Sequence, residues 1–199
     1  MRAPDLRERL KAAASEVSPP SSDFDLNPGF RLPEGRVLRE AGVLIGVMAG
    51  DVPRVLLTKR ASGPKHHPGQ IAFPGGKVDP GDGGPVAAAL REAEEEIGLP
   101  RAAVEVLGTL PPHETVTGYV VTPVIGWIRD PFDPIPEAGE VAEAFAVPFA
   151  HVADPAKFVV ESRMWRGTRR HYYAVPWGPY YIWGATARML RVLAERTQG

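Results

Sequence analysis

The stretch from Gly84 to Gly98 constrains the fold more than any other part of the 199-residue sequence. Its apolar residues recur at steps of three and four, which is the spacing of one face of an α-helix. They are Val86, Ala89, Leu90, Ala93 and Ile97. Pro85 stands where proline is favoured at the first helical position, and Gly98 stands where glycine ends a helix. The sequence therefore predicts a helix with one apolar edge against a core.

Three glutamates of this segment share a second face of the predicted helix. On a count of about 100° per residue, Glu92, Glu95 and Glu96 fall together, whereas Glu94 points elsewhere. No lysine lies four residues from Glu92 or Glu96 to form an ordinary surface pair. Carboxylate oxygens at this spacing can reach one hard cation. The alternative is a solvated acidic face, which is common on glutamate-rich helices.

The absence of cysteine narrows the chemistry that such a site can use. It excludes a disulfide scaffold, a thiolate zinc site, an iron–sulfur cluster and a cysteine nucleophile, so any metal must be held by oxygen or imidazole. The net charge of −1 argues against a general binder of nucleic acid or of anionic membranes. No apolar run reaches the ~18 residues that span a bilayer, and no secretory signal is evident, so we expect a cytoplasmic protein.

The remaining chain shows the patterns of one mixed domain. Strands outnumber helices and their order is mixed, which favours an α+β class, an α/β/α sandwich, over a doubly wound parallel sheet. We expect residues 1–35 to form a helix and a linker that pack on a domain of residues 36–199. The expected helices are 5–17, 85–97 and 181–196, and 21–35 is expected to be a loop. The expected strands are 36–48 and 54–60 as a hairpin, 104–110, 119–128 and a closing hairpin of 158–164 with 171–175, whereas 141–147 is either a strand or a helix-to-strand transition.

Basic and glycine-rich segments precede the acidic helix. Phe73-Pro74-Gly75-Gly76 is a strand that ends in a flexible loop, whose backbone amides can approach an anion closely. Upstream lies a cationic stretch without acidic residues, which includes Arg54, Lys59, Arg60, Lys65, His66 and His67. A basic loop beside a carboxylate helix is the arrangement that a polyphosphate with bridging cations needs. Arg91 is suited to orient a neighbouring carboxylate through a charge-assisted bond.

Residues 76–99 resemble a Nudix box, G-x5-E-x7-R-E-U-x-E-E-x-G-U, in which U is aliphatic. The stretch from Arg91 to Leu99 matches the second half position by position, with Ala93 as a weak U. The first half departs from the pattern, because Asp82 replaces the first glutamate and one extra residue precedes Arg91. The resemblance implies the Nudix fold, a mixed sheet between helices, and leaves a ligand role for Asp82 in doubt.

The upstream segment resembles the coenzyme A pyrophosphatases of the Nudix superfamily more narrowly. Residues 56–61, Gly69 and 73–76 are similar to their signature L-L-T-x-R-S/A-x3-R-x3-G-x3-F-P-G-G. One position differs, since Lys65 stands where that pattern has arginine, which keeps the charge but loses the bidentate fork. Segments 115–124 and 181–187 are also similar to parts of that subfamily.

This resemblance implies a metal-dependent hydrolase that cleaves coenzyme A or acyl-CoA to 3′,5′-ADP and 4′-phosphopantetheine or its acyl form. It implies Mg²⁺ or Mn²⁺ held by Glu92, Glu95 and Glu96, with Arg91 as a further residue of the catalytic set. It also implies substrate contacts from Arg60, Lys65, Gly75 and Gly76. The alternatives are a Nudix pyrophosphatase acting on ADP-ribose, NADH or other nucleoside diphosphate derivatives, and a nucleotide-binding module without turnover.

The sequence does not assign the general base or the oligomeric state. Glu92 or Glu96 could accept the proton, and so could three glutamates of a later acidic loop, Glu137, Glu140 and Glu143. His66, His67 and His113 are further candidates, although a histidine near a loop is more often simply exposed. A small-molecule nucleotide is the expected partner, with no nucleic acid and no membrane, and a homodimer is compatible with the sequence.

Overall fold

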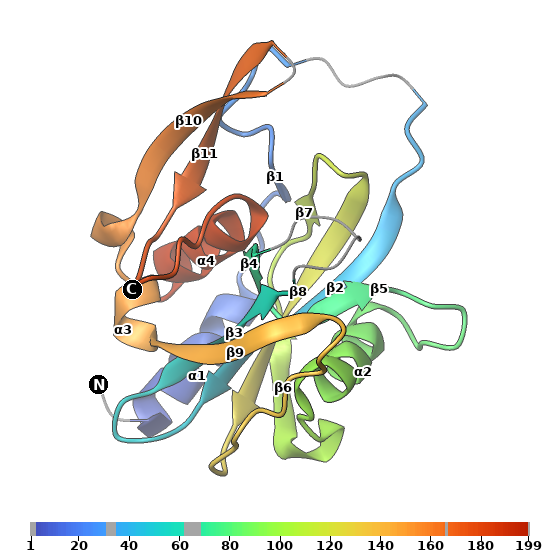
Figure 1. Cartoon of the computed structure of the whole chain (residues 1–199). Helices are drawn as coiled ribbons and strands as arrows, with labels where there is room; N and C mark the ends of the chain where they lie inside the picture. The colour runs from blue at the N-terminus through green and yellow to red at the C-terminus, as the bar shows by residue number, and fades with distance from the viewer. Residues whose placement is uncertain (1–2, 31–34, 62–68, 166, 199) are drawn as a thin grey trace.

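The computed structural model describes residues 3–30, 35–61, 69–165 and 167–198. Its helices are α1 (Ala3–Ser15), α2 (Pro85–Ile97), α3 (Phe149–Val152) and α4 (Ala185–Arg196), with short 3₁₀ turns at Arg101–Ala103 and Pro155–Lys157. Its strands are β1 (Ser21–Ser22), β2 (Arg39–Met48), β3 (Arg54–Arg60), β4 (Ile71–Ala72), β5 (Gly75–Lys77), β6 (Val104–Thr109), β7 (His113–Glu114), β8 (Tyr119–Ile128), β9 (Val141–Pro148), β10 (Val159–Trp165) and β11 (Thr168–Ala174). Figure 1 shows their arrangement in space.

A mixed sheet forms the centre of the molecule. Its main path runs β1-β7-β8-β2-β3-β4, and β5, β6 and β9 pair with β2, β8 and β3. The long pair β2–β8 is parallel, from Arg39 opposite Tyr119 to Met48 opposite Ile128. Strands β2 and β3 are antiparallel and joined by a turn, which confirms the predicted hairpin.

Helices cover both faces of this sheet. Successive residues of a strand point to opposite faces, so Leu44 of β2 packs in a core with α2 residues, whereas Ile45 packs with α1 and α4 residues in a second core. Leu44 and Ile45 are both fully buried. The predicted α/β/α sandwich is therefore confirmed.

The N-terminal helix lies on the α4 side of the sheet. Leu6 and Leu10 of α1 are fully buried in the same core as Leu190 and Leu193 of α4. The boundary at residue 35 stays a prediction. Within the described residues, no helix is both long enough and apolar enough to cross a membrane.

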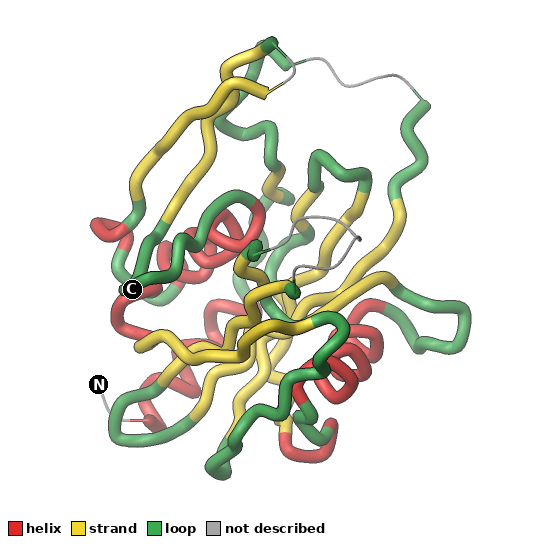
Figure 2. The backbone as a smooth tube through the Cα atoms, in the orientation of Figure 1, coloured by secondary structure: helices red, strands yellow, loops and turns green. Residues whose placement is uncertain are grey.

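Several expectations about the bounds of elements are wrong. The first helix ends at Ser15 and not at residue 17, and the strand expected from residue 36 begins at Arg39. The last helix begins at Ala185 and not at residue 181, because Gly184 has a φ of 65° and Trp183 is held by a bridge to Ala174. The segment expected to be only loop contains β1, whose Ser21 and Ser22 pair in parallel with His113 and Glu114. The closing hairpin is confirmed as β10–β11, and in Figure 2 this pair of strands stands apart from the central sheet.

Candidate active site on helix α2

Close contact between α2 and β2 fixes the position of the acidic helix. A Cβ atom at Gly42 of β2 would lie 1.8 Å from the carbonyl oxygen of Pro85, so only glycine lets the first turn of α2 approach the strand this closely. At the other end, Gly98 has a φ of 71° and its N–H group donates to the carbonyl of Glu94. Both predicted helix boundaries are thus observed.

Glu92 and Glu96 lie against the two glycines of β5. A Cβ atom at Gly76 would lie 2.4 Å from Oε1 of Glu92, which means that the carboxylate rests directly on the glycine backbone. The Gly75 N–H donates to Oε2 of Glu96 over 3.2 Å. The i, i+4 spacing therefore brings both carboxylates to β5, as expected for one helix face.

Burial makes the charge on Glu96 costly. The residue is only 6% exposed, and burial raises the pKa of its carboxyl to about 7, with a further increase from the charge of Glu92. The hydrogen bond from Gly75 and the charge of Arg60 oppose this increase. Burial also raises the pKa of Glu92, against the influence of Arg91. A bound cation would neutralise the negative charge of these two partly buried carboxylates most directly.

Arg91 connects the carboxylates of this region to one another. Its Nε donates to Oδ1 of Asp82 over 2.9 Å and its Nη2 donates to Oδ2 over 3.0 Å. Its Nη1 donates to Glu92 and to Glu95, each over 3.0 Å. The bidentate pair fixes the guanidinium, which in turn orients Glu92. Arg91 also lowers the pKa of Asp82 to about 2, so Asp82 is ionised and occupied by the arginine.

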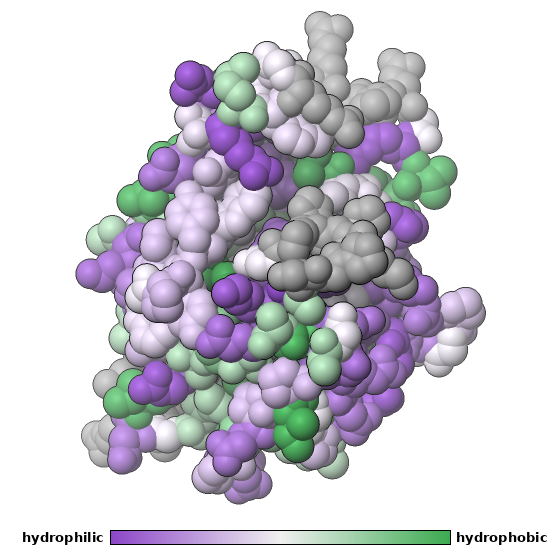
Figure 3. All heavy atoms as spheres, viewed as in Figure 1, coloured by the Kyte–Doolittle hydropathy of each residue, from purple (hydrophilic) through white to green (hydrophobic). Residues whose placement is uncertain are grey.

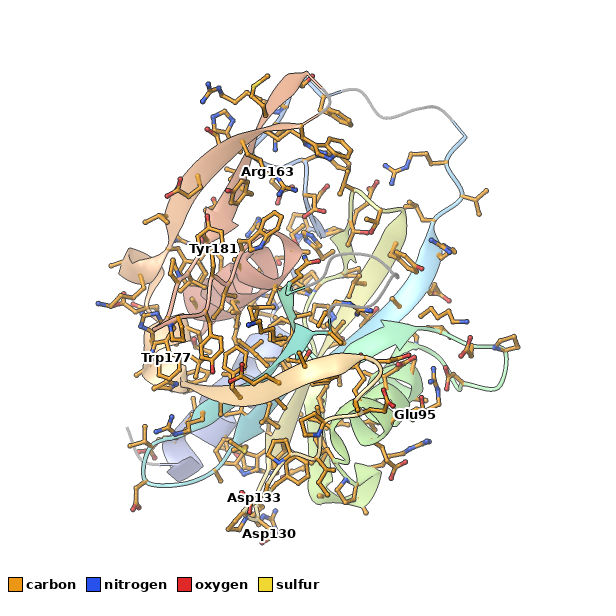
Figure 4. The ribbon with its side chains drawn as sticks, in the orientation of Figure 1. Glu95, Asp130, Asp133, Arg163, Trp177 and Tyr181 are labelled. Atoms are coloured by element: carbon orange, nitrogen blue, oxygen red, sulfur yellow. The ribbon has the colours of Figure 1, made fainter. Side chains whose placement is uncertain are left out.

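Glu95 differs from the other two glutamates of its face. Its side chain is 59% exposed and is bonded to Arg91. Figure 4 places it on α2 near β5, and Figure 3 shows a mainly hydrophilic surface over this part of the molecule. Across the described ranges, no three histidine, cysteine, aspartate or glutamate side chains converge closely enough to hold a metal ion. The structure thus brings Glu92 and Glu96 together and leaves Glu95 at the solvent edge.

Arg60 is the residue of the predicted cationic stretch that lies near the carboxylates. It ends β3, its backbone N–H donates to Gln70, and its charge reaches Glu96. Lys65, His66 and His67 lie outside the described residues. The site therefore combines two carboxylates with at least one cation.

The acidic segment before β9, residues 135–140, contacts the C-terminal end of α2. The N–H groups of Ile135 and Glu137 donate to the carbonyls of Ile97 and Glu96, over 2.9 and 2.8 Å. The charge of Glu140 raises the pKa of both Glu92 and Glu96, whereas Glu143 accepts a hydrogen bond from the Tyr180 hydroxyl. Glu143 lies in β9 and not in the predicted acidic loop, so that expectation is wrong, and Glu140 is the one of the three glutamates whose charge affects Glu92 and Glu96.

His113 is not an exposed loop histidine, and this expectation is wrong. It is fully buried, with Nδ1 2.9 Å from Oγ of Ser21 and Nε2 3.2 Å from Oδ1 of Asp23. The parallel pairing of β1 with β7 brings these groups together. The sequence shows polar residues at Ser21, Ser22 and Asp23, but it does not reveal that Ser21 and Asp23 contact His113 about ninety residues later.

Comparisons with known proteins show which family this chain belongs to. A model of the NUDIX domain matches residues 38–166. Proteins of Enterobacter sp. (strain 638) and Escherichia coli (strain K12 / DH10B), each named "Uncharacterized Nudix hydrolase NudL", are 42% identical over 156 residues, which cover 78% of this chain and 81% of each relative. This chain belongs to the Nudix hydrolase family. A solved Nudix hydrolase of M. smegmatis, RenU, is 31% identical, with a TM-score of 0.47 over 59% of this chain and 74% of that one.

Membership makes this Nudix hydrolase an enzyme that acts on nucleoside diphosphate derivatives, in a family that generally uses divalent metal ions. The donor set fits such an ion, because Glu92 and Glu96 offer hard oxygen ligands and burial raises the pKa of both carboxyls, which makes their negative charge costly without a cation. The box resemblance at residues 76–99 lies inside the matched region and spans β5 and α2.

Proposed function

We propose that this Nudix hydrolase cleaves the pyrophosphate bond of coenzyme A or acyl-CoA, with Mg²⁺ or Mn²⁺, to give 3′,5′-ADP and 4′-phosphopantetheine or its acyl form. The observation that carries the proposal is the position of Arg60. This residue belongs to the segment that resembles the coenzyme A pyrophosphatases, and its charge acts on the buried Glu96. This supports one site for the substrate signature and the carboxylate pair.

Glu92 and Glu96 are the proposed metal ligands, and Glu95 contributes through water or to a further ion. When bound, a divalent cation neutralises charge on the phosphate oxygens and lowers the pKa of the attacking water. Arg91 acts as a positioning residue, because it holds Glu92 while Asp82 holds the guanidinium. This arrangement gives Asp82 a supporting role in place of the ligand role of the first box glutamate.

The substrate phosphates are assigned to Arg60 and Lys65. Gly75 and Gly76, which the resemblance also implies as substrate contacts, lie against the carboxylates of Glu96 and Glu92. Coenzyme A carries a 3′-phosphate besides its diphosphate, and a cationic segment suits this extra charge. Glu140 is the general base that we favour outside α2, since its charge is felt by both Glu92 and Glu96. In this role its carboxylate takes a proton from the attacking water as the bond between phosphorus and the bridging oxygen breaks.

A substrate panel tests the proposal. The purified chain is incubated with Mn²⁺ or Mg²⁺ and coenzyme A, acetyl-CoA, ADP-ribose, NADH, diadenosine polyphosphates or dNTPs, and the products are separated by chromatography. We expect the highest kcat/KM for coenzyme A or its thioester, with 3′,5′-ADP as a product. A higher kcat/KM for ADP-ribose or NADH would overturn the assignment of substrate and leave the family intact. A chain that binds these nucleotides without turnover would overturn the proposed reaction.

A further inference from the structure

The β10–β11 hairpin is a two-stranded arm beside the central sheet. Its strands pair only with each other among the described strands, from Val159 opposite Ala174 to Trp165 opposite Thr168. Apolar side chains of β10 are exposed, with 44% for Val159, 54% for Val160 and 61% for Met164. Two strands alone form a marginal sheet in water, and exposed apolar edge strands tend to pair with further strands.

The backbone of β10 offers an open edge. On β11, the side chain of Asn27 accepts from the N–H of His171 and donates to its carbonyl, so His171 directs both groups away from β10. Ser162 is the cross-strand partner of His171 and must direct its own N–H and C=O away from β11, as do Val160 and Met164 two residues on either side. Within the described residues, the N–H and C=O groups of Val160, Ser162 and Met164 form no backbone hydrogen bond outside the hairpin. In Figure 1, β10 lies on the outer side of the arm.

We propose that a second copy of this chain binds along this edge, with the two β10 strands antiparallel about a twofold axis at Ser162. In this register, Ser162 faces Ser162 of the second copy, and Val160 faces Met164 of the second copy. All of these residues have outward backbone groups, so each of the facing pairs can exchange hydrogen bonds. The arrangement joins the two hairpins into one four-stranded sheet.

Charge favours the register centred on Ser162 over the two adjacent registers. Glu161 and Arg163 flank Ser162, so the twofold places Glu161 of each copy opposite Arg163 of the other. Moving the axis to residue 161 places Glu161 opposite its own copy, and moving it to residue 163 does the same for Arg163. Both shifts keep the outward backbone groups paired but set like charges opposite each other, which is unfavourable. A sequence that is complementary to itself in only one register fits a second copy of this chain better than an unrelated strand.

The two charged side chains are available for this contact. Both residues are exposed, and within the described residues neither forms an ion pair. Arg163 lies over the ring of Trp183, 4.4 Å from its centroid, which holds the guanidinium on the face that it shares with Glu161. Figure 4 shows Arg163 on the arm, far from Glu95 in this view. The contact therefore leaves the carboxylate site unchanged.

Charge exchange tests the proposal on the full-length chain. Sedimentation equilibrium measures the dimer dissociation constant of the unmodified chain, Glu161→Arg, Arg163→Glu and the double variant. Each single variant sets like charges opposite each other twice per dimer and should raise the dissociation constant by about tenfold or more. The double variant exchanges the signs and should return it close to the original value.

Two further variants keep the test decisive. Asp51→Arg, on the exposed β2–β3 turn, changes the net charge as much as Glu161→Arg and should leave the dimer intact. Ser162→Pro removes an outward N–H that β11 does not use, and should abolish dimers without a large loss of thermal stability. A monomer at every concentration, a dimer insensitive to the single variants, or a double variant that stays dissociated would each overturn the proposal.

Discussion

Glu92, Glu95 and Glu96 are chemically identical residues with different surroundings. Their common face follows from helical spacing and was predictable. Their difference was not, because it depends on which neighbour each side chain meets. Glu96 lies under the Gly75 amide, Glu92 lies on Gly76, and Glu95 turns to Arg91 in solvent. The bond between Arg91 and Asp82 could not be predicted from the sequence either, because it depends on how the chain before the helix folds back.

Glu96 should make the metal-free protein less stable as pH rises. Its pKa is about 7 when folded, against 4.5 for an ordinary glutamate, so between these values the folded state binds more protons than the unfolded state. Stability therefore falls through this window, by about 3 kcal/mol at most. We expect Glu96→Gln to flatten this decline. Melting temperatures in EDTA from pH 4 to 8 check the prediction, with Glu94→Gln as a control that keeps the slope. An unchanged slope in Glu96→Gln would contradict it.

Arg60 should contribute to substrate affinity more than to protein stability. Replacing Arg60 by alanine removes a cation near the carboxylate pair, and we expect KM for coenzyme A to rise by about tenfold, as for loss of a hydrogen bond to a charged group. Arg54→Ala removes the same side chain at the exposed opposite end of β3 and is the matched control. Steady-state kinetics measure both. Equal effects in the two variants would argue against a phosphate contact at Arg60.

Elements with strong local signals were predicted well. For α2, periodic apolar residues, Pro85 and Gly98 all agree with the observed helix. Elements that depend on distant partners were not. Strand β1 has two residues and exists only because β7 lies beside it. Residues 181–184 were expected to begin the last helix, but Trp183 forms a bridge to Ala174 and Gly184 has a φ of 65°.

The contact between β5 and α2 gives a prediction at the level of these elements. In Gly76→Ala the new methyl group would lie 2.4 Å from the Glu92 carboxylate and must displace it. A misplaced catalytic group can cost about 10²-fold in rate, so we expect a loss of this size in kcat. Gly81→Ala is the control, because nothing lies within 4 Å of its added Cβ. The kcat of both variants is measured together with circular dichroism. Normal turnover by Gly76→Ala would show that the position of Glu92 is unimportant.

For the whole molecule, the layer arrangement followed from the mixed order of strands and helices, and it is observed. The parallel pairing of β2 with β8 was not predicted, since such pairing leaves no local signal in the sequence. The place of the N-terminal helix was expected only as packing on the domain. The structure includes Leu6 and Leu10 in the larger core itself.

The N-terminal helix should therefore stabilise the whole domain. Leu10→Ala removes a fully buried side chain, and we expect it to lower the free energy of unfolding by about 2–5 kcal/mol. Glu16→Ala, exposed just after α1, should change it little. Urea unfolding followed by tryptophan fluorescence gives both values. A small effect of Leu10→Ala would show that residues before 36 form a separate, loosely attached unit.

The most direct test of a carboxylate-dependent coenzyme A diphosphatase is the turnover of coenzyme A by Glu96→Gln. Release of 3′,5′-ADP is measured with saturating Mn²⁺ for this variant, the unmodified chain and Glu94→Gln, whose carboxylate bonds Arg101 away from the site. We predict that kcat falls by about 10²–10⁴-fold in Glu96→Gln and stays near the original value in Glu94→Gln. Undiminished release of 3′,5′-ADP by a folded Glu96→Gln chain would contradict the account.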